Sequence, residues 1–343
     1  MPRRRCWRVC WGEECRRGSG FLKSGVRGET LLERGNLKQA TLPPPLQSGD
    51  RLMVIAPSGA LREMESLKQG VQIWRNWGFE VDLHPAFSER WGYLAGTDAG
   101  RQQQLADALQ DDRYRGVLCA RGGYGGTRLL EGWQWPQSMI PKWLIGFSDI
   151  TSLLWSLTKQ GIAGVHGPLL TTLGNEPDWS QQRLRDLVTG KTLPPIHGEA
   201  WVRGQAMGTL LPANLTVATC VLGTPHEPAL NGVILAFEDV TEAPYRIDRM
   251  LTHWRMMGRL DRVKGIALGR FSRCEPPTEV PSFSITEVPS FSIEEVLRDR
   301  TTDLNIPIVA NLPFGHDGDN AALPVGLNAH LNGDDGSLSI LTN

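Results

Sequence analysis

Residues 142–157 read KWLIGFSDITSLLWSL and contain the transition on which the fold depends. An apolar run typical of a buried strand ends near Gly146, and apolar residues at helical spacing follow from Ile150. Ser148 stands at the junction between the two. It is either a helix N-cap or a nucleophile on a sharp strand-to-helix turn, and the local sequence favours the N-cap.

The same alternation of strand and helix extends outward from this junction. Apolar runs and helical periodicities predict a strand at 51–59, a helix at 64–77, a strand at 79–85 and a helix at 102–112. A strand, a glycine loop and a helix follow over 115–133, and a further strand is predicted at 161–170. This order predicts βαβ units and a parallel sheet. Ligand chemistry in such sheets gathers at the carboxyl ends of the strands, where both the glycine loop and Ser148 fall.

The remainder of the chain divides into further regions. We expect a disordered extension over 1–45, an N-terminal α/β domain over 46–172, a linker over 173–203 and a C-terminal domain over 204–343. In the C-terminal domain we expect strands at 232–239, 264–272 and 306–312 and a helix at 246–258. The octapeptide TEVPSFSI occurs twice in tandem, at 278–285 and 286–293. One repeat of eight residues is too short for a solenoid, so we expect an inserted surface loop.

Composition excludes several classes of partner. Lys and Arg total 36, Asp and Glu total 37, and 40% of residues are apolar, as in an ordinary globular protein. No global field favours nucleic acid or an anionic membrane, and no apolar run approaches the roughly 20 residues that span a bilayer. The six cysteines form no CxxC pair, so free thiols in a reducing, cytoplasmic compartment are expected.

The loop ARGGYGGTRLLEG at 120–132 carries the most conspicuous chemistry. It lacks the third glycine of a dinucleotide-binding fingerprint and the GK[ST] ending of a P-loop. Its glycines either make a tight turn or free backbone N–H groups to bind a carboxylate or an oxyanion. Arg121 and Tyr124 in this loop are candidate substrate-binding side chains.

A nucleophilic serine needs a base and an acid to orient it. His316, in a Gly- and Asp-rich loop after a strand, is a better base candidate than His253 on a helix face. For the acid, Glu238 and Asp239 end a buried strand. The alternative is helix capping, because Asp239, Thr241 and Glu242 precede Pro244, a favoured first helical residue. The order Ser, Glu, His is the order of the α/β-hydrolases.

Four segments together resemble the LD-carboxypeptidase family: RGGYGGTRLL at 121–130, GFSDIT at 146–151, FEDVTEAPYRIDRML at 237–251 and PFGHDGDNAALPVG at 313–326. The resemblance runs from about Leu46 to the C-terminus. It implies an α/β fold, with a Rossmann-like parallel-sheet domain followed by a mixed, mainly β domain.

The resemblance also implies a mechanism. Ser148, Glu238 and His316 would form a catalytic triad, and the backbone N–H groups of Gly123 and Asp149 an oxyanion hole. The substrate would be a murein tetrapeptide that loses its terminal D-alanine, with no metal or other cofactor. Family members are often cytoplasmic homodimers. Asp149 would serve mainly as a helix-start cap through its side chain.

Three features depart from the family pattern, and two alternative functions are considered beside it. The family's Gly-Gly-Asn-Leu stretch is replaced here by Pro212-Ala213-Asn214-Leu215, so Pro212 puts the local loop shape in question. The extension and the tandem duplication are also foreign to the family pattern. A hydrolase of aminoacyl-nucleotide conjugates, of the microcin self-immunity type, is one alternative. A non-catalytic small-molecule binding module is the other, and it would not require Ser148, Glu238 and His316 to converge.

Overall fold

The structure is a computed structural model that describes residues 37, 39–137, 139–276 and 290–341. The described residues belong to one compact unit. Most of the expected N-terminal extension and most of the tandem duplication lie outside the described residues. Of the expected extension, Ala40 is buried and its amide donates to Gly326 O, so packed chain already precedes Leu46.

The first sheet has six strands in the order β12-β5-β4-β3-β1-β2. They are β1 (Arg51–Ile55), β2 (Glu80–Leu83), β3 (Tyr114–Cys119), β4 (Trp143–Gly146), β5 (Gly164–His166) and β12 (Leu323–Val325). The five strands from the N-terminal half are parallel, as the alternation of strand and helix predicted. Strand β12 comes from the far end of the chain and pairs antiparallel with β5.

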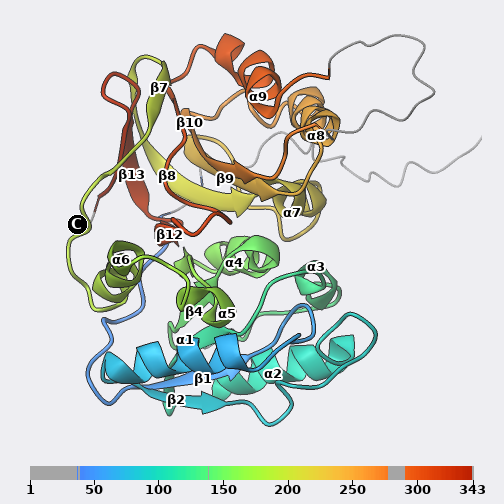
Figure 1. Cartoon of the computed structure of the whole chain (residues 1–343), viewed down its shortest axis with the longest axis vertical. Coiled ribbons are helices and arrows are strands. Elements are labelled where there is room, and N and C mark those ends of the chain that lie inside the picture. The colour runs from blue at the N-terminus through green and yellow to red at the C-terminus, as the bar shows by residue number, and fades with distance from the viewer. Residues whose placement is uncertain (1–36, 38, 138, 277–289, 342–343) are drawn as a thin grey trace, which may run out of the picture. The chain divides into compact units, whose positions relative to one another are not determined.

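Helices cover both faces of this sheet (Figure 1). In β1, Leu52 and Val54 join the apolar cluster that contains helix α1 (Glu65–Asn76). Met53 and Ile55 join the cluster that contains helix α2 (Asp98–Gln110). Successive side chains of a strand point to opposite faces, so a continuous apolar run is what a strand with two covered faces requires.

The second sheet has eight strands in the order β6-β14-β13-β8-β9-β10-β11-β7. They are β6 (Ile196–His197), β7 (Glu199–Val202), β8 (Gln205–Asn214), β9 (Val233–Val240), β10 (Gly265–Ser272), β11 (Ile308–Ala310), β13 (Asn328–Asn332) and β14 (Ser337–Ile340). Its central strands β8 to β11 are parallel and its outer pairs antiparallel. The expected fold, a parallel-sheet region followed by a mixed, mainly β region, is confirmed.

The remaining helices are α3 (Gly126–Leu129), α4 (Thr151–Thr158), α5 (Leu170–Leu173), α6 (Asp178–Val188), α7 (Leu215–Val221), α8 (Pro244–Met256) and α9 (Ile293–Thr301), with 3-10 turns η1 (Ser148–Ile150) and η2 (Thr302–Leu304). Helix α6 lies inside the segment expected to be a linker. It buries Leu184, Leu187 and Val188 at helical spacing. The flanking Pro, Lys and Gly residues obscured this apolar stripe in the sequence.

Both apolar clusters run from one sheet to the other. One contains Ile55 of the first sheet and Leu235 of the second, and the other contains Val54 and Ile234. Between the sheets, Trp155 of α4 donates from Nε1 to the carbonyl of Pro212 at 3.0 Å. The two sheets therefore share a continuous interior.

Pro212 lies in regular strand geometry rather than in a loop. It pairs with Ala236 of β9, while the pairing of β8 with β13 on the other side ends at Thr209. A proline, which has no N–H, is tolerated where a strand is paired on one side. Asn214, two residues later, accepts a hydrogen bond from Val217 N and caps α7.

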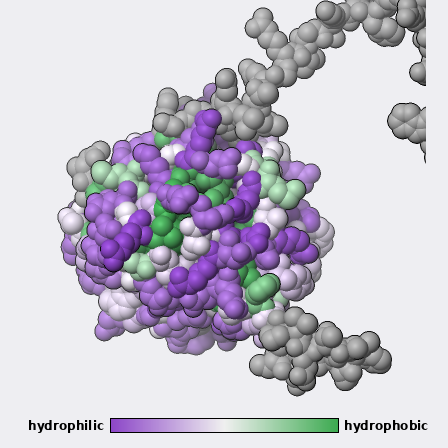
Figure 2. Space-filling view, turned by 90° about the horizontal axis from the view of Figure 1, so that it is seen from above, coloured by the Kyte–Doolittle hydropathy of each residue, from purple (hydrophilic) through white to green (hydrophobic). Residues whose placement is uncertain are grey.

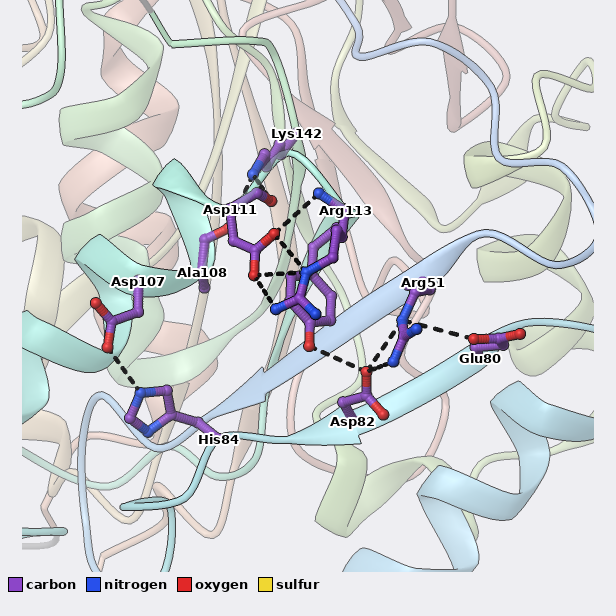
Figure 3. A network of polar contacts seen from close by, with 10 residues as sticks. Arg51, Glu80, Asp82, His84, Asp107, Ala108, Asp111, Arg113 and Lys142 are labelled. Atoms are coloured by element: carbon purple, nitrogen blue, oxygen red, sulfur yellow. Dashed lines mark hydrogen bonds and ion pairs between the residues drawn. The ribbon is translucent and has the colours of Figure 1, made fainter.

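Polar contacts hold together the region where β1 and β3 begin (Figure 3). Arg51 binds Asp82, which also accepts a hydrogen bond from the Tyr114 hydroxyl, and Arg113 binds Asp111. Figure 2 looks onto the face above β7 and α9, which is mostly hydrophilic around a central hydrophobic area. Among the described residues, no helix is both long enough and apolar enough to cross a bilayer.

Candidate active site

Ser148 follows β4 almost directly and opens η1. Its φ of 62° lies in the left-handed region, where a non-glycine residue is strained by about 1–3 kcal/mol. Phe147 occupies the N-cap position, and neither η1 nor α4 has a side-chain cap at its start. The N-cap interpretation of Ser148 is therefore wrong. A strained strand-to-helix turn is the geometry that exposes a nucleophilic hydroxyl.

The glycine loop between β3 and α3 packs against this turn. A Cβ atom on Gly122 would lie 3.2 Å from Ser148 Cβ and 3.4 Å from Ser148 Oγ. Below the turn, a Cβ atom on Gly146 would lie 2.9 Å from Ile150 Cγ1. Glycine at both positions allows this close approach, so the loop and Ser148 belong to one site.

Asp149 ties the glycine loop to the turn through its carboxylate. Its Oδ2 accepts a hydrogen bond of 2.6 Å from the amide of Gly126, the first residue of α3. The helix start that it holds is therefore that of α3 rather than of its own helix. Burial raises the pKa of Asp149 despite the hydrogen bond from Gly126, which favours the charged form.

The glycine loop and the serine turn each contain a backbone amide that was predicted to belong to the oxyanion hole. Gly123 has a φ of 109°, which turns its peptide in a way that favours glycine. Among the described residues, no hydrogen bond uses the amide of Gly123 or that of Asp149. Both predicted oxyanion-hole amides are thus free to bind a ligand atom.

Glu238 and His316 come together from distant parts of the chain. Glu238 lies on β9 and is fully buried, and His316 lies in the loop between β11 and β12. His316 Nδ1 lies 2.6 Å from Glu238 Oε2. Burial disfavours a charge on the ring, but the charge and hydrogen bond of Glu238 outweigh it and raise the pKa of His316. The hydrogen bond leaves Nε2 as the nitrogen available to accept a proton.

Asp239 has a separate role. Its carboxylate accepts hydrogen bonds from the amide and hydroxyl of Thr216, at 2.9 and 2.8 Å, and from Asn214 Nδ2. It therefore binds the start of α7. Helix α8, which the sequence suggested that Asp239 could cap, has Ala243 at its N-cap position and no side-chain cap. Burial raises the pKa of Asp239 to about 6. The two-residue period of β9 sends the neighbouring carboxylates to opposite faces.

Phe147, which precedes Ser148, packs against His316. The Phe147 ring lies 4.6 Å from the His316 ring, centroid to centroid. Ser148 Oγ makes no hydrogen bond to any described residue. Catalytic hydrogen bonds are often long in an unliganded enzyme and tighten when substrate binds. The structure thus joins Glu238 to His316 and leaves the contact between Ser148 and His316 open.

His166, at the end of β5, is a neighbour of this group that sequence reasoning did not select. It is fully buried, and its ring stacks edge-on against Phe147 and Phe314. Burial lowers its pKa to about 4, so it is neutral at ordinary pH. A neutral ring packed between the residues that flank Ser148 and His316 helps to position both. Its place at a strand end next to β4 was the available signal.

The predicted substrate-binding residues Arg121 and Tyr124 line a pocket of about 530 Å³ beside Gly123. Arg62 and Arg90 line the same pocket, and no sequence motif pointed to either. The Tyr124 ring is half exposed and lies 5.7 Å from that of Tyr93. In the described part of the chain, no three His, Cys, Asp or Glu side chains are grouped as metal ligands.

Two family models match this chain. The model of the LD-carboxypeptidase N-terminal domain matches residues 52–167, and that of the LD-carboxypeptidase C-terminal domain matches residues 207–331. The first match ends beside His166, and the second contains Glu238 and His316. Each sheet therefore corresponds largely to one family domain.

Curated relatives agree with these matches. A putative carboxypeptidase of Synechocystis is 56% identical over 299 residues, which cover 87% of this chain and 97% of the relative. The murein tetrapeptide carboxypeptidase of Pseudomonas aeruginosa is 33% identical over 303 residues, covering 82% of this chain and 93% of that one.

Solved structures share the fold. The muramoyltetrapeptide carboxypeptidase of Oxalobacter formigenes matches with a TM-score of 0.72 at 27% identity, covering 84% of this chain and 97% of that chain. The microcin C7 self-immunity protein MccF matches with a TM-score of 0.73 at 20% identity, covering 88% and 99%. The second likeness concerns the fold alone.

Proposed function

The chain belongs to the LD-carboxypeptidase family, and from that premise we propose that this peptidase is a serine carboxypeptidase that releases the terminal D-alanine of murein tetrapeptides. The hydrogen bond between Glu238 and His316 is the observation that carries the proposal. A buried carboxylate on one nitrogen of an imidazole leaves the other nitrogen as a base. A simple binding module has no need of such a pair. The strained turn at Ser148 supplies the matching nucleophile.

The reaction begins when Ser148 Oγ attacks the carbonyl carbon of the L,D peptide bond. His316 Nε2 takes the hydroxyl proton, and Glu238 holds the ring through Nδ1 and stabilises the resulting cation. The bond to nitrogen then breaks, His316 gives its proton to the amine of D-alanine, and an acyl-enzyme remains on Ser148. Water, activated by the same histidine, releases the shortened peptide.

The negative oxygen of the tetrahedral intermediate is stabilised by the amides of Gly123 and Asp149. Donors of this kind each lower the barrier by roughly 3 kcal/mol. The hydrogen bond from Gly126 to Asp149 supports this assignment, because it holds the glycine loop and the serine turn in one geometry. Arg121 and Tyr124 would contact the substrate beside this hole.

Mass spectrometry of a digest tests the proposal directly. The purified full chain is incubated with L-Ala-γ-D-Glu-meso-diaminopimelate-D-Ala, with and without EDTA, beside Ser148→Ala. We expect wild type to release one alanine, with EDTA having no effect and the variant inactive. An analogue ending in L-alanine is the matched control and should stay intact. Equal cleavage by Ser148→Ala would remove the serine from the mechanism.

An aminoacyl-sulfamoyl adenosine conjugate serves as the comparison substrate for the nucleotide-conjugate alternative. If the enzyme cleaved this conjugate and left the tetrapeptide intact, nucleotide conjugates would be the substrates on which the same triad acts. A cytoplasmic location and a homodimeric state follow from the family resemblance and stay predictions. Cell fractionation and light scattering of the purified protein measure them.

A further inference from the structure

Three arginines line the pocket beside the glycine loop: Arg62, Arg90 and Arg121. The pocket lies where the segments after β1, β2 and β3 meet, at the carboxyl ends of three parallel strands. Among the described residues, none of the three forms an ion pair with a carboxylate, although Glu63 and Glu89 are adjacent to two of them in sequence. The pocket therefore holds a local excess of positive charge.

Arginines elsewhere in the described structure are commonly paired. Ion pairs join Arg51 to Asp82, Arg113 to Asp111, Arg128 to Asp98, Arg255 to Asp303, Arg259 to Glu227 and Arg298 to Glu294. Unpaired guanidinium groups gathered in one pocket are thus a local feature and not a property of the whole surface.

Backbone carbonyls hold two of these side chains in place. Arg121 Nη1 donates to Ala60 O at 3.1 Å, and Arg90 Nη2 donates to Leu61 O. Each bond uses one of the five N–H donors that a guanidinium carries. The guanidinium group is planar and is held in position, so its remaining N–H donors can bind a carboxylate, which accepts two parallel hydrogen bonds.

Arg121 is the member nearest to the proposed reaction centre. A Cβ atom on Gly123 would lie 3.3 Å from Arg121 Nη1, and one on Gly59 would lie 2.4 Å from it. The guanidinium is therefore seated against the residue whose amide would bind the oxyanion. Partial burial lowers the pKa of Arg121, and the charge of Arg62 adds to this. A bound anion would relieve the repulsion between the two arginines.

We propose that Arg62, Arg90 and Arg121 form the subsite that binds the free C-terminal carboxylate of the peptide, with Arg121 in direct contact. This inference rests on the proposed function and deepens it. The α-carboxylate of the leaving residue lies a few bonds from the scissile carbonyl, as Arg121 lies beside Gly123. The subsite would make the enzyme an exopeptidase, because an internal peptide bond has no carboxylate at that distance.

Paired substrates test the subsite. The tetrapeptide and its C-terminal D-alaninamide analogue differ in the charge at that terminus alone. We expect wild type to cleave the acid about 10- to 100-fold faster than the amide in kcat/KM, the factor typical of a charge-assisted hydrogen bond. Arg121→Gln should lose most of this preference, chiefly by slowing cleavage of the acid. Arg90→Gln and Arg62→Gln should lose smaller parts of it.

Arg115→Gln is the matched control. Arg115 lies near the amino end of β3, the strand that leads into the glycine loop; it is exposed and should keep the full preference. A second analogue with the α-carboxylate of D-Glu amidated checks the other charge of the peptide. If Arg121→Gln affected that analogue less than the parent, the arginine would bind the acyl side and the proposal would be overturned.

Calorimetric binding to Ser148→Ala separates the subsite from the reaction. Equal cleavage of acid and amide by wild type overturns the subsite and leaves the proposed function standing. Binding of the acid that depends on Arg121, without cleavage by wild type, supports the subsite and overturns the proposed function. Neither binding nor cleavage of either peptide overturns both.

Discussion

At the amino ends of β1 and β3, charged side chains are matched to one another: Arg51 donates to Asp82 at 2.6 Å, and Arg113 binds Asp111 (Figure 3). At the carboxyl ends of β1, β2 and β3, Arg121 and the other two arginines of the pocket bind no carboxylate among the described residues. The backbone is also strained at this carboxyl edge of the sheet, at Ser148, which follows the neighbouring strand β4.

The two ends show how one sheet divides its tasks. Matched surface charges add little stability, typically 0–1 kcal/mol per pair, but they leave no group in need of a partner. Unmatched donors and a strained serine cost stability and persist because the surrounding packing holds them. Ligand chemistry is expected at the carboxyl ends of the strands, where the donors are unmatched and the serine is strained. Substitutions at both ends can break or sharpen this contrast.

The largest effect is expected from Ser148→Gly. It removes the hydroxyl and should lower kcat/KM by a factor on the order of 10⁴ or more, as loss of a triad nucleophile does. Glycine accepts a φ of 62° without a Cβ clash, so the free energy of unfolding should rise by about 1 kcal/mol. Kinetics and a denaturant titration measure the two quantities. A loss of both activity and stability would assign Ser148 a structural role.

Glu238→Gln should come next, with a fall in kcat of roughly 10³- to 10⁴-fold, because an amide can hold the ring in the wrong tautomer. The pH profile carries a second signature. The charge and hydrogen bond of Glu238 raise the pKa of His316, and the neutral ring is the base. The acid limb of kcat/KM should therefore move to lower pH in the variant. A limb that stays in place would assign the acid limb to another group.

Gly122→Ala should lower kcat/KM by about 10- to 100-fold, the range expected when a reacting group shifts by a fraction of an ångström to 1 Å. The added methyl would sit 3.4 Å from Ser148 Oγ and 3.2 Å from its Cβ, tighter than ordinary packing. The free energy of unfolding is measured in parallel. Unchanged kinetics in a folded variant would show that the loop and the turn move independently.

The smallest effect belongs to the matched end of the sheet. Asp82→Asn should leave kcat/KM unchanged and cost at most about 1 kcal/mol of stability at pH 7, since the pair is partly exposed. The hydrogen bond from Arg51 holds the pKa of Asp82 below its ordinary value. Its contribution is therefore present above about pH 4 and is lost as the pH falls through the lowered pKa. Denaturant titrations of wild type and variant should show a smaller difference in free energy of unfolding at pH 3 than at pH 7. A loss of activity in Asp82→Asn would contradict the contrast between the two ends of the sheet.

Local patterns predicted much of the framework. The apolar runs at 51–55 and 143–146 became strands, the helix expected at 64–77 is α1, and the glycine loop adjoins Ser148. These features depend on neighbours along the chain, so periodicity and loop composition reveal them. The resemblance selected His316 and Glu238 from the remaining candidates, and the two are hydrogen-bonded.

Other features depended on contacts that no local pattern encodes. Strand β12 comes from the C-terminal half of the sequence to pair with β5. The division of labour between Glu238 and Asp239 depends on which face of β9 meets α7. Arg62 and Arg90 stand in no motif, so their meeting with Arg121 could be found only in three dimensions.

The sequence by itself determined the order of strands and helices over residues 51–166, the parallel sheet that they form and the family, because these follow from spacing and from motifs of a few residues. The tertiary structure alone decided that Ser148 is strained and caps no helix, that Asp239 binds the start of α7 while Glu238 binds a histidine 78 positions away, and that charge is left unmatched in the arginine pocket. The physical reason is that strain, burial and ion pairing are set by whatever the fold brings into contact, however far apart in the chain.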